Sequence, residues 1–486
     1  MAIDIFQRAA VNWGRRFFSA SKSTRLPCMI SSTTESAVAH KFVKSPHLHY
    51  SLVSKSPVSS LVKLAAKITR ETEKLSAYLK DNGIEEPNFD VSSAVAFPKL
   101  PEDLRKSREE IITATEELRD LVTGAKERLQ WLAWDFYNVL SLRAIYHYNI
   151  AKVIPLGGTA TFEEIAQKVG LDVINVRRFM RHAMSNRIFQ EVKPEVVSHT
   201  AASKMLAEDQ SMMDWVGTWV EEGLQAADKT IEALTKYPSA SEPTQTGFCL
   251  ANGTMDIEPF YVTIERNHLR AKRFGGAMIS IDSSEGYELS HLVENYDWAS
   301  LDFNSGTIVD LGGSHGLACV ELAKRFSNLN FVVQDSPKAI ANAPALDASL
   351  SPRIKYMVHD FHTPQPIRNA DLYFFRWIMH NHSNKYATNI LRQLKPALKK
   401  GARVLINDYC LPEAGNGAVG LEERAMRTMD MNMLTFFNSQ ERSESDWIEL
   451  FGPVKGFRFL GVKRPVGSRL SLIEAVWEGE ESEESS

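Results

Sequence analysis

The sequence predicts an α/β protein, with a doubly wound, Rossmann-like domain in its second half and an all-α, winged-helix-like domain before it. Three observations lead to this prediction: a glycine-rich turn at 307–316, apolar runs alternating with helical patterns up to residue 408, and a helix-turn-helix pattern at 161–189. Strands that alternate with helices form parallel sheets, which bind ligands at the carboxyl ends of the strands.

The glycine-rich turn follows the first expected strand. An apolar run ends in Asp310, and three glycines stand before the next helical pattern: Gly312, Gly313 and Gly316. Glycine has no Cβ, so such a turn lets bare backbone approach a ligand. The spacing is not that of the Gly-x-Gly-x-x-Gly dinucleotide motif. A turn without any ligand remains the structural alternative.

Four further apolar runs predict strands, at 330–335, 354–361, 371–375 and 402–408. Three acids stand at or near the ends of these runs, namely Asp335, Asp360 and Asp408. An acid about twenty residues beyond a glycine turn typically binds ribose hydroxyls. A single acid at a strand end is more often a helix cap. Together with Asp310, however, four of the five predicted strands end at or near an acid, which favours a binding site.

Residues 308–413 resemble the plant-type S-adenosylmethionine-dependent O-methyltransferases, in particular the fungal branch that methylates phenols of sterigmatocystin-like polyketides. The matching segments are Val-Asp-Leu-Gly-Gly-Ser-His-Gly (309–316), Val-Gln-Asp-Ser-Pro (333–337), His-Asp-Phe (359–361), Arg-Trp-Ile-Met-His-Asn (376–381), Leu-Ile-Asn-Asp-Tyr-Cys-Leu-Pro-Glu (405–413) and Glu-Arg-Ser (441–443). Segments at 154–161 and 198–203 also match, so the resemblance covers most of the chain from residue 60 to 475.

The resemblance implies that His380 is a general base, with Asp408 and Glu441 as the two acids beside it. A phenol has a pKa of about 10, so a base helps it to attack a methyl sulfonium. A carboxylate can orient the imidazole and stabilise its charged form. The chain is therefore expected to methylate a phenolic hydroxyl of an aromatic secondary metabolite. A histidine taken alone would more often be structural.

The resemblance also implies a cofactor site and an acceptor pocket. The expected cofactor-binding residues are Asp310, Gly312, Gly313, Gly316, Asp335, Ser336, Asp360, Phe361 and Arg376. The expected acceptor-binding residues are Phe274, Met278, Asn432 and Met433. The structural alternatives are a surface salt bridge for Arg376 and core packing for the apolar residues.

Three residues depart from the pattern of the family. Ser314 replaces a third glycine, Asp408 is shorter than the glutamate of plant relatives, and His382 stands where tryptophan is usual. These departures leave open a protein that binds the cofactor without methylating, as a regulator or as the catalyst of another biosynthetic step. No metal is expected, because His359, His362, His380 and His382 fall on different elements.

The region before the sheet predicts a winged helix. Thr161 can cap a helix that ends at Gly170, a second helix follows, and residues 191–200 could form the wing. A DNA-binding regulator is the competing hypothesis, because the second helix carries Arg177, Arg178 and Arg181. The resemblance instead implies a dimerisation domain that supplies one wall of the acceptor pocket, and hence a homodimer.

Composition gives further limits on function. Hydrophobic residues make up 44% of the chain, charged residues 24%, and the net charge is −4, so no attraction to nucleic acid is expected. No apolar run reaches membrane-spanning length. The four cysteines form no Cys-x-x-Cys, which favours a reducing compartment.

The expected domains are an extension (1–56), the helical and winged-helix domain (57–285), the methyltransferase domain (286–477) and an acidic tail (478–486). Basic residues near the N-terminus suit a mitochondrial transit peptide, although a disordered extension or a wrongly assigned start would look alike. The expected location is cytoplasmic, with the mitochondrion as the alternative.

Overall fold

The structure is a computed structural model that describes residues 61–239, 241–413 and 420–479. The predicted extension at 1–56, with its targeting composition, lies outside these residues, as does most of the predicted acidic tail. Among the described residues, no helix is both long and apolar enough to cross a membrane.

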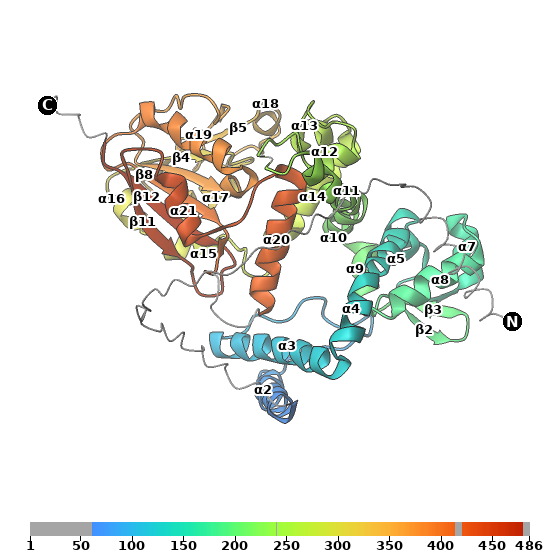
Figure 1. The fold of residues 1–486 in the computed structure, drawn as a ribbon. Helices are drawn as coiled ribbons and strands as arrows, with labels where there is room; N and C mark the ends of the chain where they lie inside the picture. The colour runs from blue at the N-terminus through green and yellow to red at the C-terminus, as the bar shows by residue number, and fades with distance from the viewer. Residues whose placement is uncertain (1–60, 240, 414–419, 480–486) are drawn as a thin grey trace, which may run out of the picture. The chain divides into compact units, whose positions relative to one another are not determined.

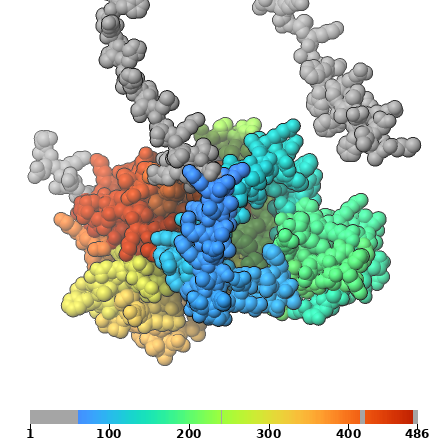
Figure 2. Space-filling model, turned by 90° about the horizontal axis from the view of Figure 1, so that it is seen from below, coloured from blue at the N-terminus to red at the C-terminus, as the bar shows by residue number. Residues whose placement is uncertain are grey.

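Helices make up the first part of the described chain. Helix α2 packs against α3, and it stands out on the face of the molecule seen in Figure 2. Three shorter helices then lead into the winged helix. The bounds are α2 (Leu61–Asp81), α3 (Glu102–Thr123), α4 (Ala125–Trp134), α5 (Phe136–His147) and α6 (Ile150–Val153).

The winged helix has the expected form. Helices α7 (Phe162–Val169) and α8 (Val173–Met184) lie beside a three-stranded sheet of order β1-β3-β2. Its strands are β1 (Thr159–Thr161), β2 (Gln190–Lys193) and β3 (Val196–Ser198). Thr161 caps α7 because its hydroxyl accepts the Glu164 N–H, while the Glu164 carboxylate accepts the Thr161 N–H. Gly170 ends α7 in the left-handed conformation, at φ 69°.

Two of the three arginines of the second winged-helix helix pair with acids of the wing, while Arg178 is exposed. Arg177 pairs with Glu195 at 2.6 Å, and Arg181 pairs with Glu191 at 2.8 Å. Both guanidinium groups also lie over the ring of Phe162. These contacts lower the positive charge that α8 presents to solvent.

A run of helices connects the winged helix to the sheet, and α10 packs along α14 (Figure 1). One turn of this run is a π-helix, η1 (Thr218–Gly223). The helices are α9 (Ala201–Glu208), α10 (Gln210–Gly217), α11 (Leu224–Lys236), α12 (Gly247–Ala251), α13 (Phe260–Glu265), α14 (His268–Asp282), α15 (Ser290–Asn295) and α16 (Trp298–Phe303).

The second half is built on a seven-stranded sheet of order β11-β12-β8-β7-β4-β5-β6. Strands β4 to β8 run parallel, and β12 lies antiparallel between β8 and β11. The bounds are β4 (Thr307–Leu311), β5 (Asn330–Asp335), β6 (Ile354–Val358), β7 (Leu372–Arg376), β8 (Arg403–Asp408), β11 (Phe457–Lys463) and β12 (Ser471–Trp477). The five predicted strands are present, whereas β11 and β12 were not predicted.

Helices cover both faces of the sheet, which confirms the doubly wound prediction. On one face Tyr373 and Phe375 pack with α19 and α21, and on the other Leu372 and Phe374 pack with α17. Successive residues of a strand point to opposite faces, so β7 contributes to both cores. The helices are α17 (Leu317–Arg325), α18 (Pro337–Ala341), α19 (Asn384–Leu394), α20 (Leu421–Phe437) and α21 (Glu444–Phe451).

The third strand ends earlier than predicted. Strand β6 stops at Val358, and Asp360 lies in the loop that follows, not within a strand. There its carboxylate accepts the His362 N–H at 2.9 Å. An aspartate whose side chain accepts the backbone N–H two residues further on forms an Asx turn.

Candidate active site

His380 lies on a short 3₁₀ turn, η2 (Met379–Asn381), just after β7. Its Nδ1 lies 2.8 Å from Oε1 of Glu441, and its backbone N–H donates to Oδ2 of Asp408 at 3.1 Å. All three side chains are buried. The structure thus brings together the three residues that the sequence predicted as catalytic.

The buried charges of this cluster act on one another. Burial by itself lowers the pKa of His380, but the charges of Glu441 and Asp408 outweigh it, so the pKa lies above the ordinary histidine value. Burial raises the pKa of Asp408, against the opposing effect of His380. One carboxylate oxygen of each acid, Oδ1 of Asp408 and Oε2 of Glu441, is buried without a hydrogen-bond partner.

Several side chains support this cluster that the sequence analysis did not single out. The Ser439 hydroxyl donates to the His380 carbonyl at 2.6 Å, and Asp430 accepts the Glu441 N–H at 2.8 Å. The ring of Trp377 lies 5.1 Å from the His380 ring. Trp377 stands within the matching segment 376–381, whereas Ser439 and Asp430 stand in no matching segment and contact only backbone groups of the cluster.

The glycine turn forms a tight cradle at the end of β4. The N–H groups of Gly312 and Gly313 both donate to the Gln334 carbonyl, at 2.8 and 3.2 Å. A Cβ on Gly312 would come within 2.4 Å of Ile378, and one on Gly313 within 2.4 Å of Asp310. Each missing Cβ therefore makes room for a side chain of the protein, which packs closely against the turn. Ser314, which replaces a glycine, adopts φ 51°.

Two acids stand beside this turn. Asp335, at the end of β5, accepts the Ser314 N–H at 2.9 Å and the Ser336 N–H at 2.6 Å. Ser336 also caps α18. Asp310 is buried under the turn, where the Cys319 thiol donates to it at 3.3 Å. Burial raises the pKa of Asp310 to about 7, although the Cys319 hydrogen bond opposes the shift.

Phe361 lies next to the cradle and belongs to an aromatic group that includes two histidines. The rings of Phe361 and His382 are 5.5 Å apart, and those of His382 and His362 are 5.1 Å apart. Burial lowers the pKa of His382 to about 3, so this ring is neutral. Among the described residues, no group of three or more metal-binding side chains is placed to hold an ion.

Arg376 is largely buried. Its Nη2 donates to the Tyr287 carbonyl at 2.7 Å, its Nη1 donates to the Asn407 side chain, and Asp282 lies 3.9 Å away. Arg376 therefore links β7 to β8 and to the chain after α14. The alternative role for Arg376, a surface salt bridge, accounts only for its contact with Asp282.

The predicted acceptor residues come from α14 and α20. Phe274 packs against an apolar cluster that includes Met433 and Phe260, and the Phe274 and Phe260 rings are 5.1 Å apart. Helix α20 packs against η2, so Asn432 and Met433 lie on an element next to His380. Met433 is only 5% exposed, while Met278 and Asn432 are half-buried.

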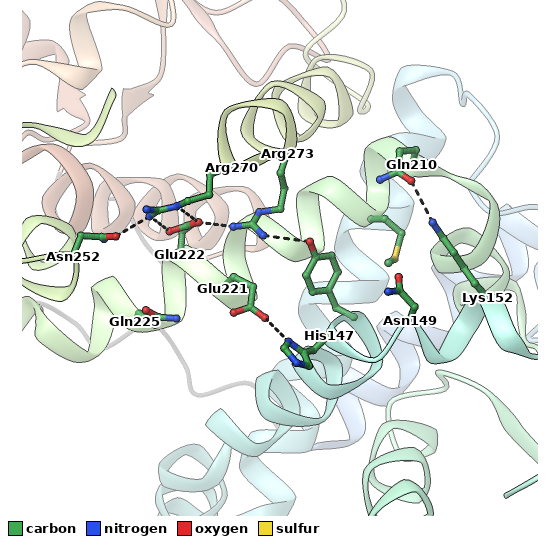
Figure 3. A pocket seen from close by; sticks show the side chains of 12 residues that line it. His147, Asn149, Lys152, Gln210, Glu221, Glu222, Gln225, Asn252, Arg270 and Arg273 are labelled. Carbon is green, nitrogen blue, oxygen red and sulfur yellow. Dashed lines mark hydrogen bonds and ion pairs between the residues drawn. The ribbon is translucent and has the colours of Figure 1, made fainter. Parts of the chain in front are cut away.

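A cavity of about 480 Å³ lies elsewhere, among α5, α6, α10, η1 and α14 (Figure 3). Arg270 and Arg273 both point to Glu222 and pair with it, and His147 lies 3.7 Å from Glu221. Glu221 also pairs with Arg143, which does not line the cavity. The charges of its lining largely compensate one another. None of the predicted site residues lines this cavity.

Two family models match the chain. The O-methyltransferase domain matches residues 259–458, and the O-methyltransferase dimerisation domain matches residues 132–209. A chlorophenol O-methyltransferase of Trichoderma longibrachiatum is 43% identical over 87% of this chain and 91% of its own. The O-methyltransferase gsfB of Penicillium aethiopicum is 34% identical over 87% of this chain and 99% of its own.

Solved structures share the fold. OxaC in complex with SAH and oxaline has a TM-score of 0.66 at 20% identity, and covers 85% of this chain and 100% of its own. LepI in complex with SAM has a TM-score of 0.65 at 21% identity, over 85% and 100%. The fold and the matched domains define an S-adenosylmethionine-dependent methyltransferase. More specifically, the chain belongs to the plant-type O-methyltransferase family, as the sequence predicted.

Proposed function

We propose that this enzyme methylates a phenolic hydroxyl of an aromatic secondary metabolite, with His380 as the general base. The observation that carries the proposal is the contact of 2.8 Å between His380 Nδ1 and Glu441 in a buried cluster. A phenolic acceptor is supported by the 43% identical relative, which is named a chlorophenol O-methyltransferase. Family membership favours methyl transfer over the non-methylating alternative.

The cluster is arranged to move one proton. With Nδ1–H donating to Glu441, the other ring nitrogen of His380, Nε2, is left to take the phenolic proton. The carboxylates of Glu441 and Asp408 stabilise the resulting imidazolium. The phenolate oxygen would then bond to the methyl carbon while the carbon–sulfur bond of the donor breaks and its electron pair passes to sulfur. S-adenosylhomocysteine would be the leaving group, and the proton on Nε2 would be released to solvent.

S-adenosylmethionine supplies an electrophilic methyl group on a sulfonium. We assign its binding to the glycine cradle and to Asp335 and Ser336, with Phe361 and Asp360 towards the adenine. Asp310, Gly316 and Arg376, the other residues predicted to bind the cofactor, are assigned to the same site. Phe274, Met278, Asn432 and Met433 are assigned to the acceptor, because methionine and aromatic side chains hold a flat ring by shape and dispersion.

The variant His380→Gln tests the role of the base. Its turnover of a chlorophenol is expected to fall roughly 10²- to 10⁴-fold, because a general base contributes about that much. Methyl ether formation is measured by mass spectrometry, and binding of S-adenosylhomocysteine by calorimetry, which should be unchanged. His268→Gln is the matched control, since His268 is exposed at the start of α14. Undiminished turnover in His380→Gln would overturn the proposed role.

The enzyme is further proposed to act as a homodimer. Seven large apolar side chains of α4 and α5 are exposed, each by at least 40%. They are Leu129, Trp131, Leu132, Trp134, Phe136, Tyr137 and Leu140, here called the α4–α5 face. The matched dimerisation domain begins at residue 132, within this face. A contiguous apolar surface of this kind usually marks an interaction site.

A further inference from the structure

Arg442 is fully buried, and its guanidinium group faces the turn that carries His380. Its Nη1 donates to the Met379 carbonyl at 3.0 Å, and its Nη2 donates to the His382 carbonyl at 2.7 Å. These two carbonyls lie one residue before and two residues after His380. Arg442 therefore holds the main chain on both sides of the proposed base.

The guanidinium group is itself held in place. Its Nε and Nη2 donate to the Asn384 side-chain oxygen at 3.0 and 2.9 Å. Its central carbon lies 5.2 Å from the centroid of the Trp447 ring. The guanidinium is planar, so these contacts fix the direction of every N–H that reaches the turn.

The local backbone explains why adjacent residues have different tasks. Arg442 begins β10 (Arg442–Ser443), which pairs with β9 (Cys410–Leu411) just beyond the Asp408 end of β8. Successive side chains of an extended chain point to opposite sides. Glu441 thus contacts the imidazole of His380, while Arg442 contacts the backbone that bears it.

We propose that Arg442 is a positioning residue for methyl transfer, which fixes the 379–382 turn so that the His380 imidazole stays aligned between Glu441 and the acceptor. This inference rests on the proposed function of His380. A misplacement of about 1 Å in an active site can cost about a hundredfold in rate, so a fixed turn has a measurable effect.

Arg442 also acts on His380 by its charge. Three charged groups shift the pKa of His380: Glu441 and Asp408 raise it, and Arg442 lowers it. The ring of His382 is neutral. Loss of the Arg442 charge would raise the pKa of His380 further. This effect separates a positioning role next to the base from a general contribution to folding.

The test compares Arg442→Lys with Arg442→Gln in the full-length enzyme. Both are expected to lower kcat at least about tenfold, because neither side chain can span two carbonyls as the guanidinium fork does. The KM for S-adenosylmethionine should stay unchanged. The acid limb of the kcat profile should move to higher pH in the glutamine variant only. Wild-type kcat and an unshifted limb in both variants would overturn the proposal.

A milder variant covers the case in which the Arg442 variants do not fold. Asn384→Ala leaves Arg442 in place and removes its anchor, so a smaller loss of kcat is expected, whereas wild-type kcat would contradict the proposal. Comparison with His380→Gln separates two failures. If His380→Gln is active, the proposed function fails; if His380→Gln is inactive and Arg442→Lys is normal, only this inference fails.

Discussion

At the scale of residues, the main feature is a histidine whose charge depends on two buried acids. As the proposed base, His380 has to be neutral to accept a proton, yet Glu441 and Asp408 favour its charged form. The same carboxylates that orient the ring therefore also set the pH at which it can act. This balance leads to a prediction about pH.

The acid limb of kcat/KM is expected to have its midpoint above about 6.5, the ordinary histidine value, because the pKa of His380 is raised. Activity should fall as the pH drops through that midpoint. In Glu441→Gln the loss of the negative charge should move the midpoint to lower pH, and turnover should also fall. Initial rates across the pH range give both quantities, and a midpoint that rises in Glu441→Gln would contradict the argument.

The predicted catalytic residues could be found from sequence because they belong to linear segments that resemble a family. Ser439 and Arg442 could not be found in this way, although Arg442 stands within a matching segment. Their partners are the carbonyls of His380, Met379 and His382, and a carbonyl is present at every position. A contact between a side chain and a backbone carbonyl therefore cannot be recognised from the residue types in the sequence.

At the scale of elements, the turn between β4 and α17 depends on both conformation and space. Gly312 has φ 75°, which disfavours any side chain, and its missing Cβ leaves room for Ile378. Gly401 has φ 85° but no atom near its absent Cβ. A side chain at Gly401 would therefore cost only conformational strain, whereas one at Gly312 would also collide with Ile378.

Gly312→Ala is expected to lose binding of S-adenosylhomocysteine and to destabilise the protein by more than the roughly 1–2 kcal/mol of a left-handed alanine. Gly401→Ala should show only that conformational cost, with cofactor binding intact. Thermal unfolding and calorimetry measure the two effects. Equal behaviour of the two variants would mean that close approach at Gly312 is unimportant.

The strands that the sequence predicted differ in burial from the edge strand that it did not predict. Strands β4, β5, β7 and β8 are buried on both faces and are therefore read as apolar runs. Strand β11 lies at the edge of the sheet with Arg458 and Lys463 in it, and its burial alternates. No helical pattern separates β11 from β12, so the alternation that predicted the other strands was absent here.

At the scale of the whole molecule, the α4–α5 face is the clearest sign of a partner. Helix α4 has no buried residue at all. Trp131 and Trp134 lie edge to face, 5.9 Å apart, which makes a rigid apolar surface. A second copy of the chain would remove this surface from water.

The double variant Trp131→Glu, Trp134→Glu is expected to shift the protein from a dimer to a monomer of 54.6 kDa, because two buried charges would be costly at an apolar interface. Light scattering after size exclusion measures the mass. Val466→Glu is the control, since Val466 is also exposed but lies far from α4 in sequence. A monomeric wild type, or a dimeric double variant, would contradict the proposed interface.

The position of β12 has a consequence for synthesis on the ribosome. This strand is translated last of the seven, yet it lies inside the sheet, between β8 and β11. Until residue 477 has been made, β8 presents an unpaired edge next to Asp408, and β11 has no strand to pair with. The active site and the sheet are therefore completed together, by the same late segment, and a nascent chain that stops before Ser471 would keep an open, aggregation-prone edge.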